Sequence, residues 1–102
     1  MERKIKFIGH GKRWFDKVNG NTYHSVTVTR VRDGKIIGKS FRYGYDDAYR
    51  QTAIELMAEK KFLPVKYRKR ENRYLYEREN NYPIEWIRED TTKKDMINHG
   101  IV

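Results

Sequence analysis

The residues best suited to metal binding or proton transfer are three histidines, His10, His24 and His99. Only His99 has a carboxylate at the helical spacing of four residues, in Asp95, and two candidate ligands do not make a metal site. We therefore expect surface histidines, with His24 at the edge of the core, and no metal ion.

Other constellations give no better case for catalysis. Glu55 and Glu59 share a helix face, as do many solvated carboxylates, and no second spaced element completes a two-metal site. The acidic residues around Glu85, Glu89 and Asp90 have the same weakness. Residues 9–12, Gly-His-Gly-Lys, are too short for a phosphate-binding loop and lead into no helix. We expect a protein that is not an enzyme and has no cofactor, and a metal-dependent nuclease is the least favoured alternative.

Cations next to aromatic residues form a stronger pattern. Trp14 and Phe15 are adjacent and are flanked by Lys12, Arg13 and Lys17. Such rings stack on bases while the cations contact phosphates. They can equally close one end of a small core, and we favour this structural role because a short chain needs its large rings inside. The cations then remain available for binding.

Two further groups of cations are candidates. A polar strand face that could enter a DNA major groove, or be an ordinary solvated face, would carry Thr27, Thr29, Arg30, Arg32, Lys39, Ser40 and Arg42. A second group suits phosphate contact with stacking, or the rim of a protein interface, and comprises Tyr67, Arg68, Lys69, Arg70, Arg73 and Tyr74. Both alternatives stay open for each group.

Alternating apolar and polar residues predict the strands that would position these side chains. We expect strands at 3–8, 23–32 and 35–43, with a loop at 9–12 and a turn at 19–21. Asp33 and Gly34 predict a two-residue hairpin turn that places Val31 opposite Ile36, Val26 opposite Phe41 and His24 opposite Tyr43. The predicted core face carries Val26, Val28, Ile37, Phe41 and Tyr43.

The second half of the chain predicts helices and one more strand. Asp46 or Asp47 can begin a helix that ends near Phe62, before Pro64. Its apolar stripe is Tyr49, Ala53, Leu56 and Met57. We predict extended structure at 66–81, a strand at 84–88, and a short helix capped by Thr91 or Thr92 and ended by Gly100. The fold class is α+β in a single domain over 1–102: a three-stranded antiparallel sheet packed by one main helix, followed by a further strand or strands and a short C-terminal helix.

Charge and composition limit the partners. The chain has a net charge of +9, and residues 1–45 hold 11 Lys and Arg against 3 Asp and Glu. Such a field attracts polyanions, although basic surfaces also serve solubility alone. The absence of Cys excludes disulfides and thiolate metal sites, and no apolar run approaches the roughly 20 residues that span a bilayer. We expect a cytoplasmic protein without a membrane partner.

Several motifs resemble small proteins of bacteriophage genomes. They are residues 13–26, RWFDKVNGNTYHSV, with Tyr43-Gly44-Tyr45 leading to Gln51-Thr52-Ala53, Tyr76–Asn80 and Lys93–Met96. The resemblance spans most of the chain and implies a phage protein acting in the host cytoplasm, but no particular activity. It suggests either an accessory nucleic-acid-binding protein or an anti-defence protein such as an anti-CRISPR inhibitor.

Together these observations favour a non-enzymatic phage-type accessory protein that binds nucleic acid through a basic sheet face. The alternative is an anti-CRISPR-like inhibitor that binds a host defence protein or ribonucleoprotein. Its exposed Tyr and Arg residues are of the types enriched at binding hot spots.

Overall fold

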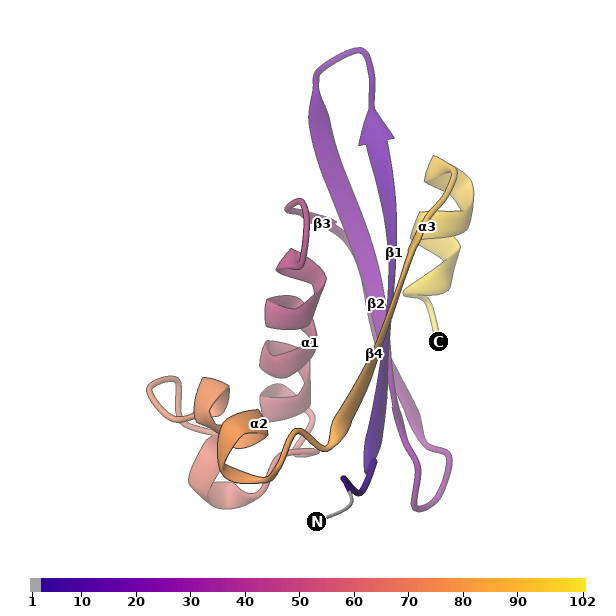
Figure 1. Cartoon of the computed structure of the whole chain (residues 1–102). Helices are drawn as coiled ribbons and strands as arrows, with labels where there is room; N and C mark the ends of the chain where they lie inside the picture. Colours follow the sequence, from indigo (N-terminus) through magenta and orange to yellow (C-terminus); the bar gives the residue numbers. More distant parts are fainter. Residues whose placement is uncertain (1–2) are drawn as a thin grey trace.

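A four-stranded sheet organises the computed structural model, which describes residues 3–102. The strands lie in the order β3-β2-β1-β4, with β1 antiparallel to β2 and parallel to β4 (Figure 1). Their bounds are β1 Phe7–Asp16, β2 Asn21–Arg30, β3 Ile36–Tyr43 and β4 Ile84–Asp90. The predicted α+β class is confirmed, since three antiparallel strands are packed by one main helix and followed by a further strand and a short helix.

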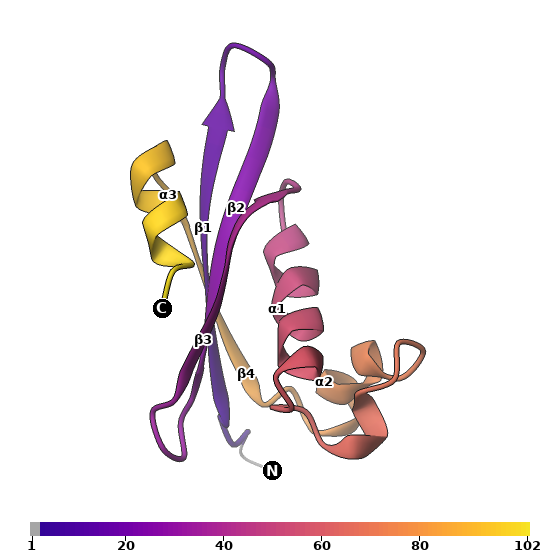
Figure 2. The same ribbon diagram turned by 180° about the vertical axis from the view of Figure 1, so that it is seen from behind.

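Helices lie on both faces of this sheet. The main helix, α1 (Ala48–Glu59), covers one face, and the short C-terminal helix, α3 (Lys93–His99), covers part of the other (Figures 1 and 2). Between α1 and β4 the chain forms two 3₁₀ turns and a single helical turn. These are η1 Val65–Tyr67, η2 Arg73–Leu75 and α2 Tyr76–Glu79.

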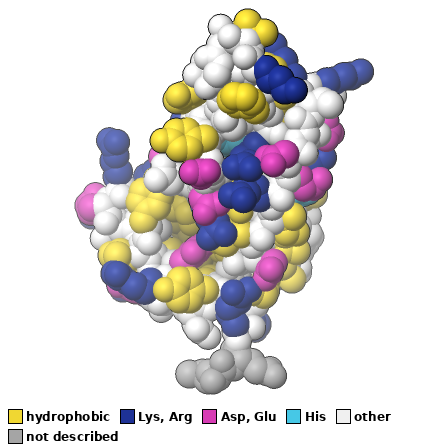
Figure 3. Space-filling view, turned by 45° about the horizontal axis from the view of Figure 1, so that its top comes forward, with side chains coloured by type: hydrophobic (Ala, Val, Ile, Leu, Met, Phe, Trp, Pro, Cys, Tyr) yellow, Lys and Arg dark blue, Asp and Glu magenta, His cyan; other side chains and the backbone are white. Residues whose placement is uncertain are grey.

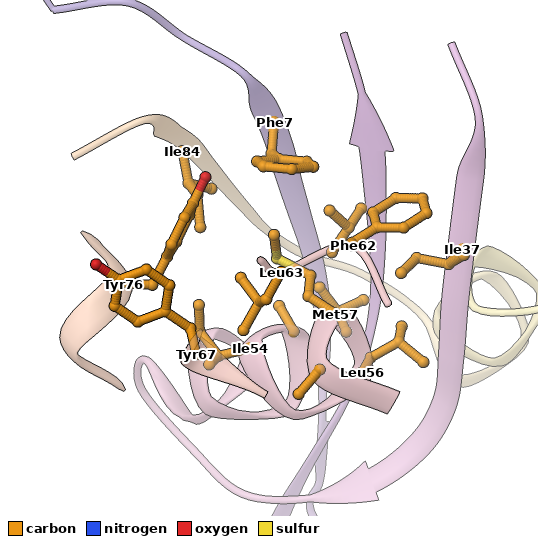
Figure 4. Close-up of a cluster of buried hydrophobic side chains, with 14 of the residues drawn as sticks. Phe7, Ile37, Ile54, Leu56, Met57, Phe62, Leu63, Tyr67, Tyr76 and Ile84 are labelled. Carbon is orange, nitrogen blue, oxygen red and sulfur yellow. The ribbon is translucent and has the colours of Figure 1, made fainter. Parts of the chain in front are cut away.

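The core lies between α1 and the sheet. Every residue of the predicted α1 stripe is buried, and so are Val26, Val28 and Ile37 of the predicted strand face. Phe7 stacks on Phe62 with ring centroids 5.9 Å apart, where the chain leaves α1 (Figure 4). Apolar side chains therefore close the sheet against the helix, as their periodicity predicts.

The predicted loop at residues 9–12 is wrong, because these residues belong to β1. Gly9 and Gly11 face α1, and large rings lie directly over both. A Cβ at Gly9 would lie 2.5 Å from Trp86, and one at Gly11 would lie 2.4 Å from Tyr49. These glycines allow side chains to approach the backbone closely, which is one reason for glycine inside a strand.

The β2–β3 hairpin is present, but its predicted register is wrong by two residues. Arg30 N donates to Lys35 O at 2.8 Å, and Thr29 rather than Val31 lies opposite Ile36. The Asp33 carboxylate explains the longer turn, because it accepts hydrogen bonds from Lys35 N and from the Arg30 guanidinium. The Arg30 guanidinium holds the pKa of Asp33 well below its usual range. A shift of two leaves each residue on its predicted face.

A β-bulge further along β3 changes the faces. Two residues of β3, Ser40 and Phe41, lie opposite the single residue Ser25 of β2, and Phe41 has a φ of 55°. Beyond the bulge Tyr43 lies opposite Tyr23. Because an extra residue reverses the alternation, Phe41 and Tyr43 lie on the face that carries α3. Their predicted place in the core is wrong.

Of the predictions for the second half of the chain, one is wrong and two are confirmed. The extended structure at 66–81 is wrong: Arg68 Nε donates to Leu63 O and Arg73 Nη2 to Arg68 O, which stabilises turns instead. The strand at 84–88 is confirmed and extends to Asp90. The predicted cap of α3 is also confirmed, since Asp95 N donates to Thr92 Oγ1.

His24 is fully buried and makes two hydrogen bonds. Its Nδ1 lies 3.2 Å from Gly44 O, which can only accept, so Nδ1 carries the proton and Nε2 accepts from Thr52 Oγ1 at 2.7 Å. Burial lowers the pKa of His24, and it also lowers the pKa of His99. Both rings therefore resist protonation in the folded chain more than they do in the unfolded chain.

We expect the free energy of unfolding to fall as the pH drops below about 6.5, because the unfolded histidines then bind protons that the folded ones resist. Urea midpoints at pH 7.5, 6.5 and 5.5 would measure this slope. His24→Gln and His99→Gln should each flatten it. A slope unchanged in both variants would show that these rings are not its source.

Candidate ligand-binding site at the β1–β2 hairpin

β1 and β2 extend beyond the rest of the sheet as a two-stranded hairpin (Figure 1). Pairing of β4 with β1 ends at Arg13, whose carbonyl accepts from Thr91 N at 2.7 Å. At the tip, the Asp16 carboxylate accepts from Val18 N and Asn19 N and closes the predicted turn. The hairpin therefore presents both faces of Trp14–Asp16 and an open edge of β1.

Four aromatic residues lie side by side on the α3 face of this hairpin and of β3. The Trp14 and Tyr23 rings are stacked with centroids 6.0 Å apart, and Tyr23 stacks on Phe41 at 4.9 Å. Tyr43 meets Tyr23 edge-on at 5.8 Å. We call Trp14, Tyr23, Phe41 and Tyr43 the aromatic cluster. Phe41 is 43% exposed and Tyr43 is 65% exposed, so the cluster is open to a ligand.

Lys93, the first residue of α3, places a positive charge beside this cluster. Its Nζ lies 5.3 Å from the centroid of Trp14 and 5.9 Å from that of Phe41. Within residues 3–102 no acidic side chain lies within 4 Å of this ammonium group. The group can thus contact an anion held next to the rings.

A hollow of about 600 Å³ continues from the cluster around the open edge of β1. Phe15 and Tyr45 line it together with Trp14, Lys17 and Lys93. Phe15 is 54% exposed, so the prediction that this ring closes the core is wrong. Trp14 also lies outside the core and packs on Tyr23 instead.

The predicted cations of this segment differ in availability. Lys12 Nζ lies 3.1 Å from Asp95, and Arg13 Nη2 lies 2.7 Å from Asp90, so both contact carboxylates. Lys17 makes no ion pair with the described residues and lines the hollow. On the face shown in Figure 3, basic and acidic side chains are interspersed rather than separated. One ion pair of the described chain joins Arg88 Nη1 and Asp47 Oδ1, which lie 3.0 Å apart.

The structure does not bring the predicted strand-face residues onto one open surface. Thr27 is buried beneath α3, and Ser40 Oγ donates to Ile97 O at 2.6 Å. Arg30 points to the opposite face, where its guanidinium lies 4.6 Å from the centroid of Phe62.

The other predicted cations are dispersed. Lys39, Arg42 and Arg73 line a small hollow beside α1, and Arg32 lines another hollow with Lys4 and Lys6 at the opposite end of the sheet from the hairpin tip. Arg68 binds backbone oxygen, Tyr74 OH donates to Glu55, and Lys69 and Arg70 are exposed in a turn.

Sequence reasoning missed Tyr23, Phe41, Tyr43 and Lys93 as site residues. The density of aromatic residues around Tyr43 could have indicated an aromatic site. The bulge that turns these rings away from the core is not indicated by any residue pattern in the sequence.

Comparison with protein-family models, curated proteins and solved structures gave no match for this chain. The resemblance to small bacteriophage proteins stays a prediction. No helix within residues 3–102 is long and apolar enough to cross a membrane. The same residues contain no group of three His, Asp or Glu side chains arranged to hold a metal ion.

Proposed function

We propose that this protein is a non-enzymatic nucleic-acid-binding protein that binds a single strand at the aromatic cluster. The stacked row of Trp14, Tyr23 and Phe41 beside the Lys93 ammonium carries this proposal. Aromatic side chains stack on unpaired bases, and neighbouring cations contact the phosphates. The surface differs from the basic sheet face predicted above, because α3 covers part of that face.

A single strand suits the cluster better than a duplex. The exposed rings of Phe41 and Tyr43 offer flat apolar faces, which bases can reach only when they are unstacked from a helix. The net charge of +9 adds a long-range attraction for any nucleic acid. The rings would thus select unpaired strands among the polyanions that the charge attracts.

Fluorescence anisotropy with labelled single-stranded RNA, single-stranded DNA and duplex DNA over a salt series tests this function. We expect Phe41→Ala and Tyr43→Ala each to weaken single-strand binding about 5- to 150-fold, since a stacked base contributes about 1–3 kcal/mol. Tyr82→Ala is the matched control, because Tyr82 is half exposed and lies just before β4, away from the cluster. It should bind like the unsubstituted protein.

A second pair of variants tests the phosphate contact. Lys93→Gln should remove about one phosphate contact. The slope of the logarithm of the binding constant against the logarithm of the salt concentration should then become shallower by about 0.7 for a single strand. Lys94→Gln removes the same charge from the next residue and should leave the slope nearly unchanged. An equal change of slope in the Lys93 and Lys94 variants would contradict the proposed site. An affinity for duplex DNA equal to that for single strands would contradict it as well. Absence of binding to all three nucleic acids would instead favour a host protein as the partner.

A further inference from the structure

The free edge of β3 has unpaired backbone groups. Arg30 N donates to Lys35 O, and alternate residues of a strand direct their backbone groups to the same side. The backbone N–H and C=O groups of Ile37 and Lys39 therefore point to β2. Those of Ile36, Gly38 and Ser40 point outward, away from the sheet. No hydrogen bond from residues 3–102 reaches these outward groups. They can pair with another extended chain.

The other edge of the sheet is better protected against such pairing. Strand β4 carries four exposed charged side chains, Glu85, Arg88, Glu89 and Asp90. Charges on an edge strand oppose the approach of a further strand. From Ile36 to the bulge at Ser40, by contrast, β3 has a single charged side chain, Lys39, and Ile36 is half exposed. The open edge is thus a short segment of β3.

A groove runs between this edge and α1. It has a volume of about 130 Å³, and three cations line it: Lys39 and Arg42 from β3, and Arg73 from η2. Within the described chain none of the three has a carboxylate within 4 Å. Arg73 Nε is buried and makes no hydrogen bond with the protein. Unsatisfied buried donors of this kind are uncommon in folded proteins.

Two carboxylates line the α1 side of the groove, and neither forms an ion pair within 4 Å with these cations. Glu55 accepts a hydrogen bond from Tyr74 OH at 3.1 Å, and Glu59 is exposed at the end of α1. The strand side of the groove is entirely basic, so a chain pairing with β3 would meet positive charge first. A carboxylate there would bind Lys39 or Arg42 and reach toward Arg73.

We propose that an extended acidic segment of a partner protein adds to β3 as a further strand and places its carboxylates among Lys39, Arg42 and Arg73. The outward groups of Ile36, Gly38 and Ser40 would give affinity, and the three cations would select acidic side chains. A second copy of this chain fits less well, because each copy carries a net charge of +9. This surface adjoins the aromatic cluster along β3 but lies on the other face of the strand, because Arg42 faces α1 whereas Phe41 and Tyr43 face α3.

A labelled eight-residue peptide of alternating Glu and Val is the probe, and the same peptide with Lys in place of Glu is its control. We expect the acidic peptide alone to bind, to shift the NMR signals of the Ile36, Gly38 and Ser40 amides, and to slow their hydrogen exchange. Equal affinity for the acidic and the basic peptide would overturn the proposal. NMR signal shifts confined to the β4 amides would overturn it as well. So would a dimer formed through β3 without peptide.

Substitutions separate the backbone and charge contributions. Ile36→Pro removes an outward N–H without removing a bond to β2, and it should weaken acidic-peptide binding at least about 5-fold relative to Ile36→Ala. Lys39→Glu with Arg42→Glu should weaken it at least about 10-fold. Lys4→Glu with Lys94→Glu changes the net charge equally, away from the groove, and should have a much smaller effect. Equal losses in the two double variants would overturn the charge selection.

The two proposed surfaces can be tested apart. Trp14→Ala, on β1 and therefore two strands away from β3, should leave acidic-peptide binding within about 2-fold while it weakens single-strand binding. If the Lys39→Glu and Arg42→Glu pair instead abolishes RNA binding and leaves peptide binding intact, the groove belongs to nucleic acid and the proposal fails.

Discussion

Gly11→Val is expected to lower the free energy of unfolding by about 3 kcal/mol, the upper part of the range for overpacking a well-filled core. A Cβ at this position would lie 2.4 Å from a ring carbon of Tyr49, which is fully buried on α1. The ring has little freedom to move, because it packs edge-on against Trp86 with centroids 5.7 Å apart. Relief would therefore require α1 to move away from the sheet.

Urea unfolding followed by circular dichroism measures this loss, and the thermal midpoint should fall by about 12 °C or more. Gly34→Ala is the control, because Gly34 has a φ of +72° and open space around its Cβ position. It should cost only about 1 kcal/mol, the penalty of a left-handed backbone for alanine. If Gly11→Val cost no more than Gly34→Ala, the contact between Tyr49 and β1 would be looser than described.

Met96→Ala is expected to cost about 2–5 kcal/mol, with the loss concentrated in α3. Among Lys93–His99, all of which the structure describes, only the Met96 side chain is buried below a tenth of its surface. A helix of seven residues does not persist alone in water. Without this anchor we expect α3 to detach from the sheet before the rest of the protein unfolds.

Hydrogen exchange checks this result, since the α3 amides should exchange much faster in Met96→Ala while those of α1 keep most of their protection. Met96→Leu conserves volume and should cost less than about 1.5 kcal/mol. Ile101→Ala, at an exposed position just beyond α3, should change little. Uniformly faster exchange in α1 and α3 would show that α3 unfolds only with the whole domain.

Features set by neighbouring residues were predicted from the sequence. The stripe on α1, the Thr92 cap of α3 and the alternation of Val26 and Val28 all depend on residues close in the chain, and the structure confirms them. The hairpin turn was found for the same reason, because Asp33 and Gly34 favour a turn. Its length was wrong, since the Asp33 contacts with Arg30 and Lys35 depend on geometry that propensity does not give.

Features set by distant residues were not predicted. Gly9 and Gly11 indicate a loop until Trp86 and Tyr49 are known to lie over them. The parallel pairing of β1 with β4 likewise joins segments far apart in the chain, for which no local pattern exists.

The candidate site was predicted only in part, for the same reason. Trp14, Phe15 and Lys17 were identified as candidates, but the rings were assigned to the core. Phe41 and Tyr43 were assigned there too, because strict alternation holds only as far as the bulge. Lys93 joins them through the packing of α3, which brings the end of the chain back to its beginning.

The parallel pairing of β1 with β4 also sets the order in which the elements of the sheet can fold during synthesis on the ribosome. β1, β2, β3 and α1 are synthesised in sequence and can assemble early, since each contacts a near neighbour along the chain. The inner strand β1 then keeps one side unpaired until Ile84–Asp90 leaves the exit tunnel, and α3 follows last. Such long-range closure slows folding. A nascent chain stalled before residue 84 would expose the edge of β1 from Phe7 to Arg13 to chaperones and to other nascent chains, whereas β4 pairs with this edge in the finished fold.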